Sequence, residues 1–179
     1  MAKAIKTLIL PLLDANPGKL EALASTEALF TQMVQFYMDI LLTNPSFWDK
    51  ALQVDPETGE IRSERASTNQ DILTRLEFAT VSTLAHPDPP DPLSILPGAE
   101  DAPVVFRRAA INRTIGLAKS YRSNRKRWES LPENRRGKPP AIPTVRSLPA
   151  TFYQGMALLA RETSRSFLKV KVWNGQAWQ

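Results

Sequence analysis

Apolar residues recur along the chain with helical spacing in several segments. Between residues 19 and 42 they lie three or four positions apart, which is typical of a helix with one buried face. They are Leu20, Leu23, Phe30, Met33, Val34, Tyr37 and Leu41. A second helix is expected from a cap at Thr68 or Asn69 to about Leu84, with Ile72, Leu73, Leu76 and Ala79 facing inward.

The longest helical pattern starts near Asp101-Ala102-Pro103 and continues to Trp128 or Glu129. At 100° per residue it separates into two stripes. The apolar stripe holds Phe106, Ala110, Leu117, Tyr121 and Trp128, and a basic stripe well away from it holds Arg108, Lys119, Arg122 and Lys126. We expect this helix to pack by one side and to present cations on the other.

Two segments have the composition of strands, and a shorter helix is expected at 151–162 between them. Residues 3–12 are rich in Ile, Leu and Thr. Leu168, Val170 and Val172 alternate with lysines, and Asn174-Gly175 is a strong hairpin signal. The returning strand would have hardly begun at Gln179, which leaves half a ladder unpaired. We therefore expect a truncated chain, a piece of a longer protein; the alternative is a natural C-terminus with a frayed edge.

Prolines mark two segments without regular structure. Six of them lie between Pro87 and Pro103, which predicts an extended connector at 87–103. A second group, with Arg135, Arg136, Lys138 and Arg146 among the prolines, predicts an extended basic loop at 131–149. The polar stretch VDPETGEIRSE, after the first helix, is expected to form turns.

Charge divides the chain into two unlike halves. The 179 residues have a net charge of +5, and 42% of them are hydrophobic, enough to form a core. Residues 1–100 hold seven Lys/Arg against fourteen Asp/Glu, whereas residues 101–179 hold sixteen against four. An excess of this size favours a polyanionic partner for the C-terminal half. A merely solvated basic surface is the alternative.

The residue types of common active sites are absent or badly spaced. There is no cysteine, which excludes thiolate zinc sites and fits a reducing cytoplasm. His86 is the only histidine, and it lies among prolines. Asp55, Glu57, Glu60 and Glu64 resemble a surface charge run. We expect no catalytic residue, no metal ligand, no cofactor and no small-molecule substrate. Lys3 and Lys6 interrupt an apolar run that is too short to cross a bilayer, so we expect no membrane partner and a cytoplasmic location.

The run SYRSNRKRWES has the composition of a nucleic-acid contact. Arginine and lysine neutralise phosphates, small polar side chains donate to phosphate oxygens, and aromatic rings stack on bases. Core packing is the alternative role for the two aromatic residues, because they lie on the apolar stripe. The candidate contact residues are Arg107, Arg108, Lys119, Tyr121, Arg122, Arg125, Lys126, Arg127, Arg135, Arg136 and Lys138.

Several sequence segments resemble segments in the N-terminal half of transposon-encoded TnpB/OrfB proteins and follow the same order along the chain. These proteins are relatives of the type V CRISPR effector nucleases. The segments are KTLILPLLDANPGKLEALASTEALFTQMVQFY, FRRAAINRTIGLAKSYRSNRKRW, GKPPAIP, LPATFYQGM and SFLKVKVWNGQAW. In that family a helical recognition domain interrupts a small wedge β-barrel, and the two hold a guide RNA and its heteroduplex with target DNA.

The resemblance implies an α+β fold, mainly a helical recognition domain inserted between strands of a small, here incomplete, β-barrel. Residues 1–15 would hold the first barrel strand, 16–165 the helical domain, and 166–179 the start of the returning hairpin. The partners would be guide RNA and target DNA. The family's metal-dependent nuclease domain and cysteine zinc ribbon have no counterpart here, so no cleavage step is assigned to this chain.

Two other hypotheses remain open at this point. The chain is a self-contained nucleic-acid-binding accessory protein without nuclease activity, or it is a protein-interaction module whose acidic half docks on its own basic half. The last hypothesis predicts that the cations of residues 101–179 are neutralised by carboxylates of residues 1–100.

Overall fold

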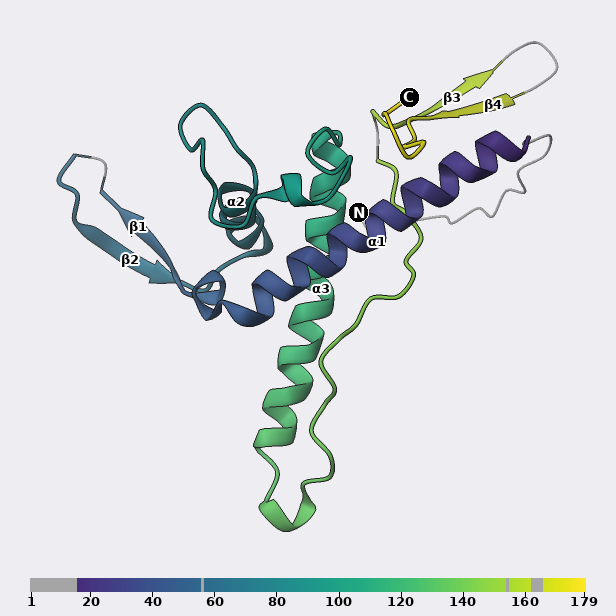
Figure 1. The fold of residues 1–179 in the computed structure, drawn as a ribbon. Helices are drawn as coiled ribbons and strands as arrows, with labels where there is room; N and C mark the ends of the chain where they lie inside the picture. The colour runs from purple at the N-terminus through teal and green to yellow at the C-terminus, as the bar shows by residue number, and fades with distance from the viewer. Residues whose placement is uncertain (1–15, 56, 154, 162–165) are drawn as a thin grey trace.

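A computed structural model describes residues 16–55, 57–153, 155–161 and 166–179. Within these ranges the fold is α+β, with three α-helices and two two-stranded antiparallel sheets. Figure 1 shows a body made of crossed helices, from which a helix and a hairpin project. The strand predicted at 3–12 lies outside the described residues.

The first helix, α1, runs from Pro17 to Thr43 and matches the predicted range closely. Asn16 caps it by accepting a 2.9 Å hydrogen bond from the Lys19 amide, and Pro17 occupies the first turn, where no amide donor is needed. The helix ends at Asn44-Pro45 because a residue before proline avoids the helical region. A 3₁₀ turn, Pro45–Trp48, follows.

The third helix, α3, runs from Val104 to Glu129 and crosses α1 to form the core (Figure 1). Phe106 is fully buried against Phe30, with ring centroids 5.3 Å apart in an edge-to-face arrangement. The Thr114 hydroxyl donates a 3.1 Å hydrogen bond to the carbonyl of Val34, which lies 80 residues earlier in the sequence. The buried set of α3 is Phe106, Ala109, Ala110, Ile111, Thr114, Ile115 and Ala118.

The second helix, α2, runs from Asn69 to Thr80 and begins at the predicted cap. The Thr68 side chain accepts from the Asp71 amide, and the Asp71 carboxylate accepts from the Thr68 amide, which forms a capping box. Contrary to the prediction, the helix ends at Thr80 and not near Leu84. The last turn closes at Val81, whose amide donates to the Glu77 carbonyl.

The acidic stretch after the 3₁₀ turn forms a β-hairpin that was not predicted. Strand β1, Ala51–Val54, pairs antiparallel with β2, Ile61–Arg65. The Asp55 carboxylate accepts from the Glu57 amide at 2.8 Å, and Gly59 has φ of +73°, which suits a tight turn. The hairpin extends away from the body (Figure 1).

The proline connector is anchored in the core, which corrects the expectation of a purely extended segment. It contains a 3₁₀ turn, Leu93–Ile95, and it buries Leu93, Ala99 and Ala102. The segment is bent back onto α2, where the Asp91 amide donates to the Ala79 carbonyl at 3.0 Å.

The C-terminal region is a second hairpin, so the helix predicted at 151–162 is wrong over its described residues. Strand β3, Ala157–Arg161, pairs antiparallel with β4, Ser166–Val170, so the C-terminal strand does have a partner. The turn predicted at Asn174-Gly175 is confirmed by a bridge between Trp173 and Trp178. Among the described residues the sheets have two strands each, and no barrel is formed.

Candidate nucleic-acid interface

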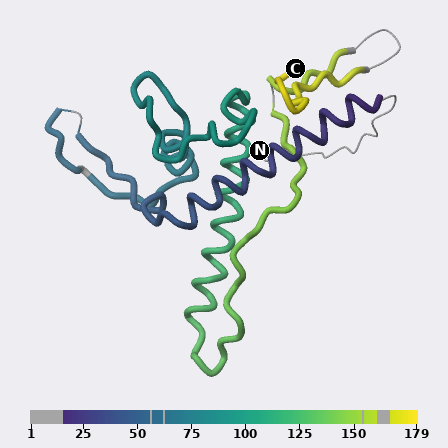
Figure 2. The backbone as a smooth tube through the Cα atoms, viewed as in Figure 1, coloured from purple at the N-terminus to yellow at the C-terminus, as the bar shows by residue number. Residues whose placement is uncertain are grey.

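The C-terminal half of α3 leaves the body and carries many of the predicted contact residues. Ala118 is the last buried residue of the helix. From Lys119 to Lys138 every residue is exposed except Tyr121 and Trp128, which are half-buried. We call residues 119–138 the basic arm. Its helical part is about 16 Å long at 1.5 Å per residue, and the chain turns at its tip and runs back beside α3 (Figures 1 and 2).

The tip of the basic arm is held by contacts to backbone carbonyls. The Trp128 indole N–H donates to the Gly137 carbonyl at 2.8 Å. Arg136 donates to the carbonyls of Leu131 at 2.7 Å and Glu129 at 2.5 Å, and its guanidinium lies 5.6 Å from the centre of the Trp128 ring. These contacts satisfy carbonyls at the C-terminal end of α3. Arg136 therefore serves the structure of the tip.

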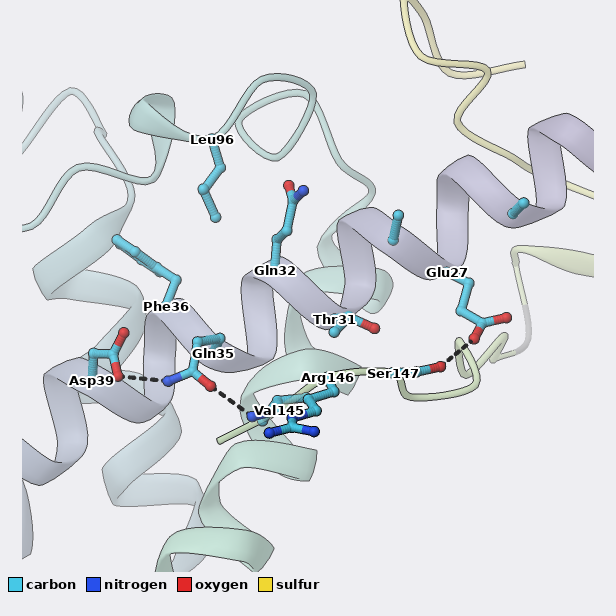
Figure 3. Close-up of a pocket in the computed structure, with 12 residues that line it drawn as sticks. Glu27, Thr31, Gln32, Gln35, Phe36, Asp39, Leu96, Val145, Arg146 and Ser147 are labelled. Carbon is cyan, nitrogen blue, oxygen red and sulfur yellow. Dashed lines mark hydrogen bonds between the residues drawn. The ribbon is translucent and has the colours of Figure 1, made fainter. Parts of the chain in front are cut away.

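The returning segment is fastened to α1 farther from the tip. The amide of Val145 donates to the Gln35 side-chain oxygen at 2.8 Å, and the amide of Leu148 donates to the Thr31 hydroxyl at 3.1 Å. The Ser147 hydroxyl donates to Glu27, as Figure 3 shows. Since α1 and α3 are packed together, this attachment closes the arm into a loop with both ends fixed on the body.

Several predicted phosphate contacts have partners within the protein. Arg107 donates to the carbonyls of Glu100 and Ala102, at 3.3 and 2.5 Å. Arg108 forms a two-pronged ion pair with Glu77 of α2, at 2.8 and 3.0 Å. The structure therefore assigns both arginines a role in joining α3 to the connector and to α2.

Three cations of the basic arm have partial partners. Lys119 donates to the Asn69 side chain at 2.5 Å. The Arg122 guanidinium lies 4.5 Å from the centre of the half-buried Trp48 ring. Arg125 pairs with Glu129 at 2.8 Å, and this carboxylate holds the pKa of Arg125 above its usual range. Each of the three cations remains exposed, so a phosphate could still approach it.

Four predicted cations have no carboxylate partner among the described residues. They are exposed side chains on both limbs of the arm: Lys126, Arg127, Arg135 and Lys138. Exposed Arg113 and Arg146 share this property and were left out of the predicted contact set. In the described part of the chain, Arg108–Glu77 is the one ion pair that joins the acidic half to the basic half. The arm thus keeps a positive surface.

The aromatic residues of the arm stand apart from the core. Tyr121 and Trp128 were predicted to lie on the apolar stripe of the helix, but the buried part of α3 ends before either of them. The Tyr121 hydroxyl accepts a long, 3.4 Å hydrogen bond from Arg125. The rings support the arm, and both stay accessible in part.

The described ranges contain neither a metal-binding cluster nor a membrane-spanning helix. No group of three or more His, Cys, Asp or Glu side chains could hold a metal ion there. No helix in these ranges is sufficiently long and apolar to cross a bilayer. His86 makes an edge-to-face contact with Phe78, with ring centroids 5.2 Å apart.

Comparison with known proteins identifies relatives over almost the whole chain. The model of the Aq_aa04 family matches residues 6–174. Over 176 residues the chain is 31% identical to the uncharacterized protein aq_aa04 of Aquifex aeolicus (strain VF5), which covers 94% of this chain and 95% of that protein. No solved structure matches. These matches do not test the resemblance to TnpB/OrfB proteins, which stays a prediction. The chain belongs to the Aq_aa04 family.

Proposed function

We propose that this protein binds nucleic acid through the basic arm. The observation that carries the proposal is the set of exposed cations, Lys126, Arg127, Arg135 and Lys138, that no carboxylate neutralises within the described residues. An internal ion pair would have to be broken before such a side chain could bind a phosphate. These four cations carry no such cost, and they lie on a feature that projects into solvent (Figure 2).

Binding of this kind is driven by counterion release. Each phosphate that a cation neutralises adds about −0.7 (single strands) to −0.9 (B-form duplex) to the slope of log affinity against log salt concentration. Removing two contacting cations should therefore flatten the slope by about 1.4 to 1.8. Contacts to the phosphates of a nucleic acid fix its position on the protein and do not distinguish its bases.

The experiment is a salt titration of RNA binding with two matched variants. K126A/R127A removes two unpaired cations of the arm, and K19A/K50A removes two exposed lysines elsewhere. Both variants lose the same net charge. We expect the flattened slope for K126A/R127A and an unchanged slope for K19A/K50A. Equal slopes in all three proteins would refute the assignment of the arm.

The finer form of the proposal is that the RNA is a guide and that the protein holds it, with its DNA heteroduplex, as the recognition part of a transposon-associated RNA-guided endonuclease. Its support is the family resemblance in the sequence together with the cationic arm. This finer form of the proposal also includes a small β-barrel. The described residues form two two-stranded sheets and no barrel. Cleavage, with its divalent metal and zinc, would belong to other residues.

A self-contained accessory protein is the second candidate. The exposed cations of the basic arm support it equally, because phosphate binding needs no nuclease domain. Sequencing the RNA that co-purifies with the protein from its native host separates the candidates. One enriched transcript with a constant scaffold supports a guide, whereas a broad mixture of transcripts supports the accessory protein. If neither RNA nor DNA binds at low salt, the protein-interaction hypothesis is favoured.

A further inference from the structure

The two β-hairpins lie near opposite ends of α1, and both leave their side chains largely uncovered (Figure 1). No described side chain between Leu52 and Arg65 is buried, and the described side chains of β3 and β4 are exposed or half-buried. A two-stranded hairpin in water is marginally stable by itself and normally needs a further strand or another element packed against it. Each hairpin therefore has a surface that is available to another molecule.

One face of the β1–β2 hairpin is apolar. Residues directly opposite each other in an antiparallel pair point to the same side of the sheet, as do residues two positions apart on one strand. Val54 lies opposite Ile61, and Leu52 lies two residues before Val54, so the three side chains share a face. Each of them is more than half exposed. Adjoining exposed apolar residues, in contrast to scattered ones, indicate an interaction surface.

The β3–β4 hairpin has an apolar face of the same kind. Ala160 lies opposite Phe167, and Leu158 lies two residues before Ala160 on the same face. Leu158 is 64% exposed and Phe167 is 42% exposed. Lys169 lies opposite Leu158 and shares this face, and exposed Lys171 follows two residues later. The face thus combines two large apolar side chains with two lysines.

The two hairpins carry opposite charge. Residues 49–65 hold five carboxylates against three basic side chains, whereas residues 157–171 hold four basic side chains against one carboxylate. Four exposed side chains have no ion-pair partner within the described residues: Glu57, Glu60, Lys169 and Lys171. Complementary charge on two apolar faces steers their association and fixes its register.

The two hairpins of one chain are too far apart to contact each other. The first follows the C-terminal end of α1, after the 3₁₀ turn. The base of the second is fixed near the other end of α1, where the Trp173 amide donates to the Thr26 hydroxyl at 2.8 Å. The helix extends for about 26 Å from Thr26 to Thr43, whereas packed sheet faces lie about 10 Å apart. The face that complements each hairpin is therefore found on a second copy of the chain.

We propose that the β1–β2 hairpin of one copy packs on the β3–β4 hairpin of a second copy, apolar face against apolar face, with Glu57 and Glu60 beside Lys169 and Lys171. The inference does not depend on the nucleic-acid proposal. Because the two surfaces differ and lie at opposite ends of the molecule, the contact joins copies head to tail. Strands of four and five residues form a face smaller than half of a standard interface, which buries about 1,600 Å² in total. The association is therefore weak and depends on concentration.

The test is sedimentation velocity of the full chain over a concentration series up to about 500 μM, because small interfaces give weak complexes. We expect the average sedimentation coefficient of the wild-type protein to rise with concentration. E57K/E60K and K169E/K171E should each weaken the association on the order of tenfold, because like charges then face each other. An equal mixture of the two variants should regain association, since the acidic hairpin of the second variant fits the basic hairpin of the first.

A control variant and a cross-linking measurement identify the surfaces in contact. E100K/E133K changes the net charge as E57K/E60K does, at exposed positions outside the hairpins, and should associate as the wild type does. A carbodiimide joins a carboxylate directly to a lysine amine. In a mixture of unlabelled and heavy-isotope-labelled wild-type protein, we expect links between light and heavy chains that join Glu57 or Glu60 to Lys169 or Lys171.

Three results would each overturn the inference. The wild-type protein stays monomeric over the whole series, the two double variants associate as strongly as the wild type, or their mixture regains no association although circular dichroism shows both to be folded. If a variant does not fold, the cross-links of the wild-type protein decide. Self-association without a link between the two hairpins also excludes this contact.

Discussion

Arg136 offers a sharp test of how the basic arm is built. The sequence predicts that Arg136 contacts a phosphate. In the structure Arg136 caps the end of α3 by donating to the carbonyls of Leu131 and Glu129. Replacement by lysine keeps the charge and removes the planar fork that reaches both carbonyls. R136K therefore separates the role of the charge from the role of the hydrogen bonds.

The expected magnitude follows from the contacts that are lost. Two exposed hydrogen bonds from a charged donor contribute about 1 kcal/mol together at this surface, and the guanidinium over Trp128 contributes about 0.5 kcal/mol. Their sum, about 1.5 kcal/mol, corresponds to roughly tenfold more frequent local opening, because 1.4 kcal/mol is tenfold in an equilibrium constant. The opening should be confined to the tip, since Val145 and Leu148 hold the other end of the loop.

Hydrogen–deuterium exchange measures this opening directly. In R136K the hydrogen-bonded amides of the tip, those of Ser130, Leu131 and Arg135, should exchange about tenfold faster, whereas those of α1 should keep their wild-type rates. R135K, which changes a neighbouring cation that makes no side-chain bond within the described residues, is the matched control. Unchanged exchange at the tip of R136K would refute the capping role and return Arg136 to the phosphate-binding set.

Three further predictions concern the stability of the body. F106A should lower the free energy of unfolding by about 3–5 kcal/mol in a urea titration, because the ring is fully buried and in contact with Phe30; a loss below 1 kcal/mol would show that the core is elsewhere. G98A should lower the melting temperature, since its φ is +81° and the new Cβ would strike Trp173; an unchanged melting temperature would contradict this geometry. The hydrogen bond from Arg65 is the main cause that holds the pKa of Asp71 well below its usual range, and the bond from the Thr68 amide adds to it. The ionised carboxylate therefore stabilises the fold. This stability is present above about pH 4 and is lost as the pH falls through the folded-state pKa. Urea titrations of D71N and wild type should therefore differ most at neutral pH and converge in strong acid; a difference that does not change with pH would refute the linkage.

The helices were predictable because their signals are local. Thr68 and Pro103 mark the starts of α2 and α3 in the sequence, and the apolar spacing between residues 19 and 42 lies within α1. The prediction of an apolar stripe along α3 was correct only for the N-terminal half of the helix. Periodicity extends the stripe to Trp128, whereas burial stops at Ala118, because α1 covers only the first half of the helix.

The hairpins depended on contacts that a short window of sequence does not contain. The residues of β1 and β2 are mostly exposed, so no alternation of apolar and polar positions marks them. In β3 the adjacent Leu158 and Leu159 resemble part of an apolar helix face, and the pairing with β4 decides the conformation. Tertiary pairing overrides local preference in such segments.

The candidate site was predictable in composition and less so in detail. The concentration of cations after residue 106 located the basic arm, but a cation's identity does not reveal its partner. The acceptors of Arg107 and Arg136 are backbone carbonyls, which the fold brings into reach. The distinction between cations that hold the structure and cations that are available to a ligand therefore requires the three-dimensional arrangement.

Lysine footprinting with and without RNA tests the central claim most directly. Mild acetylation followed by mass spectrometry reports the reactivity of each lysine in the wild-type protein. The account predicts that saturating RNA at low salt protects Lys126 and Lys138 of the arm, while Lys19 and Lys50 stay as reactive as in the free protein. Equal reactivity of all four lysines with and without RNA, or protection confined to Lys19 and Lys50, would contradict it.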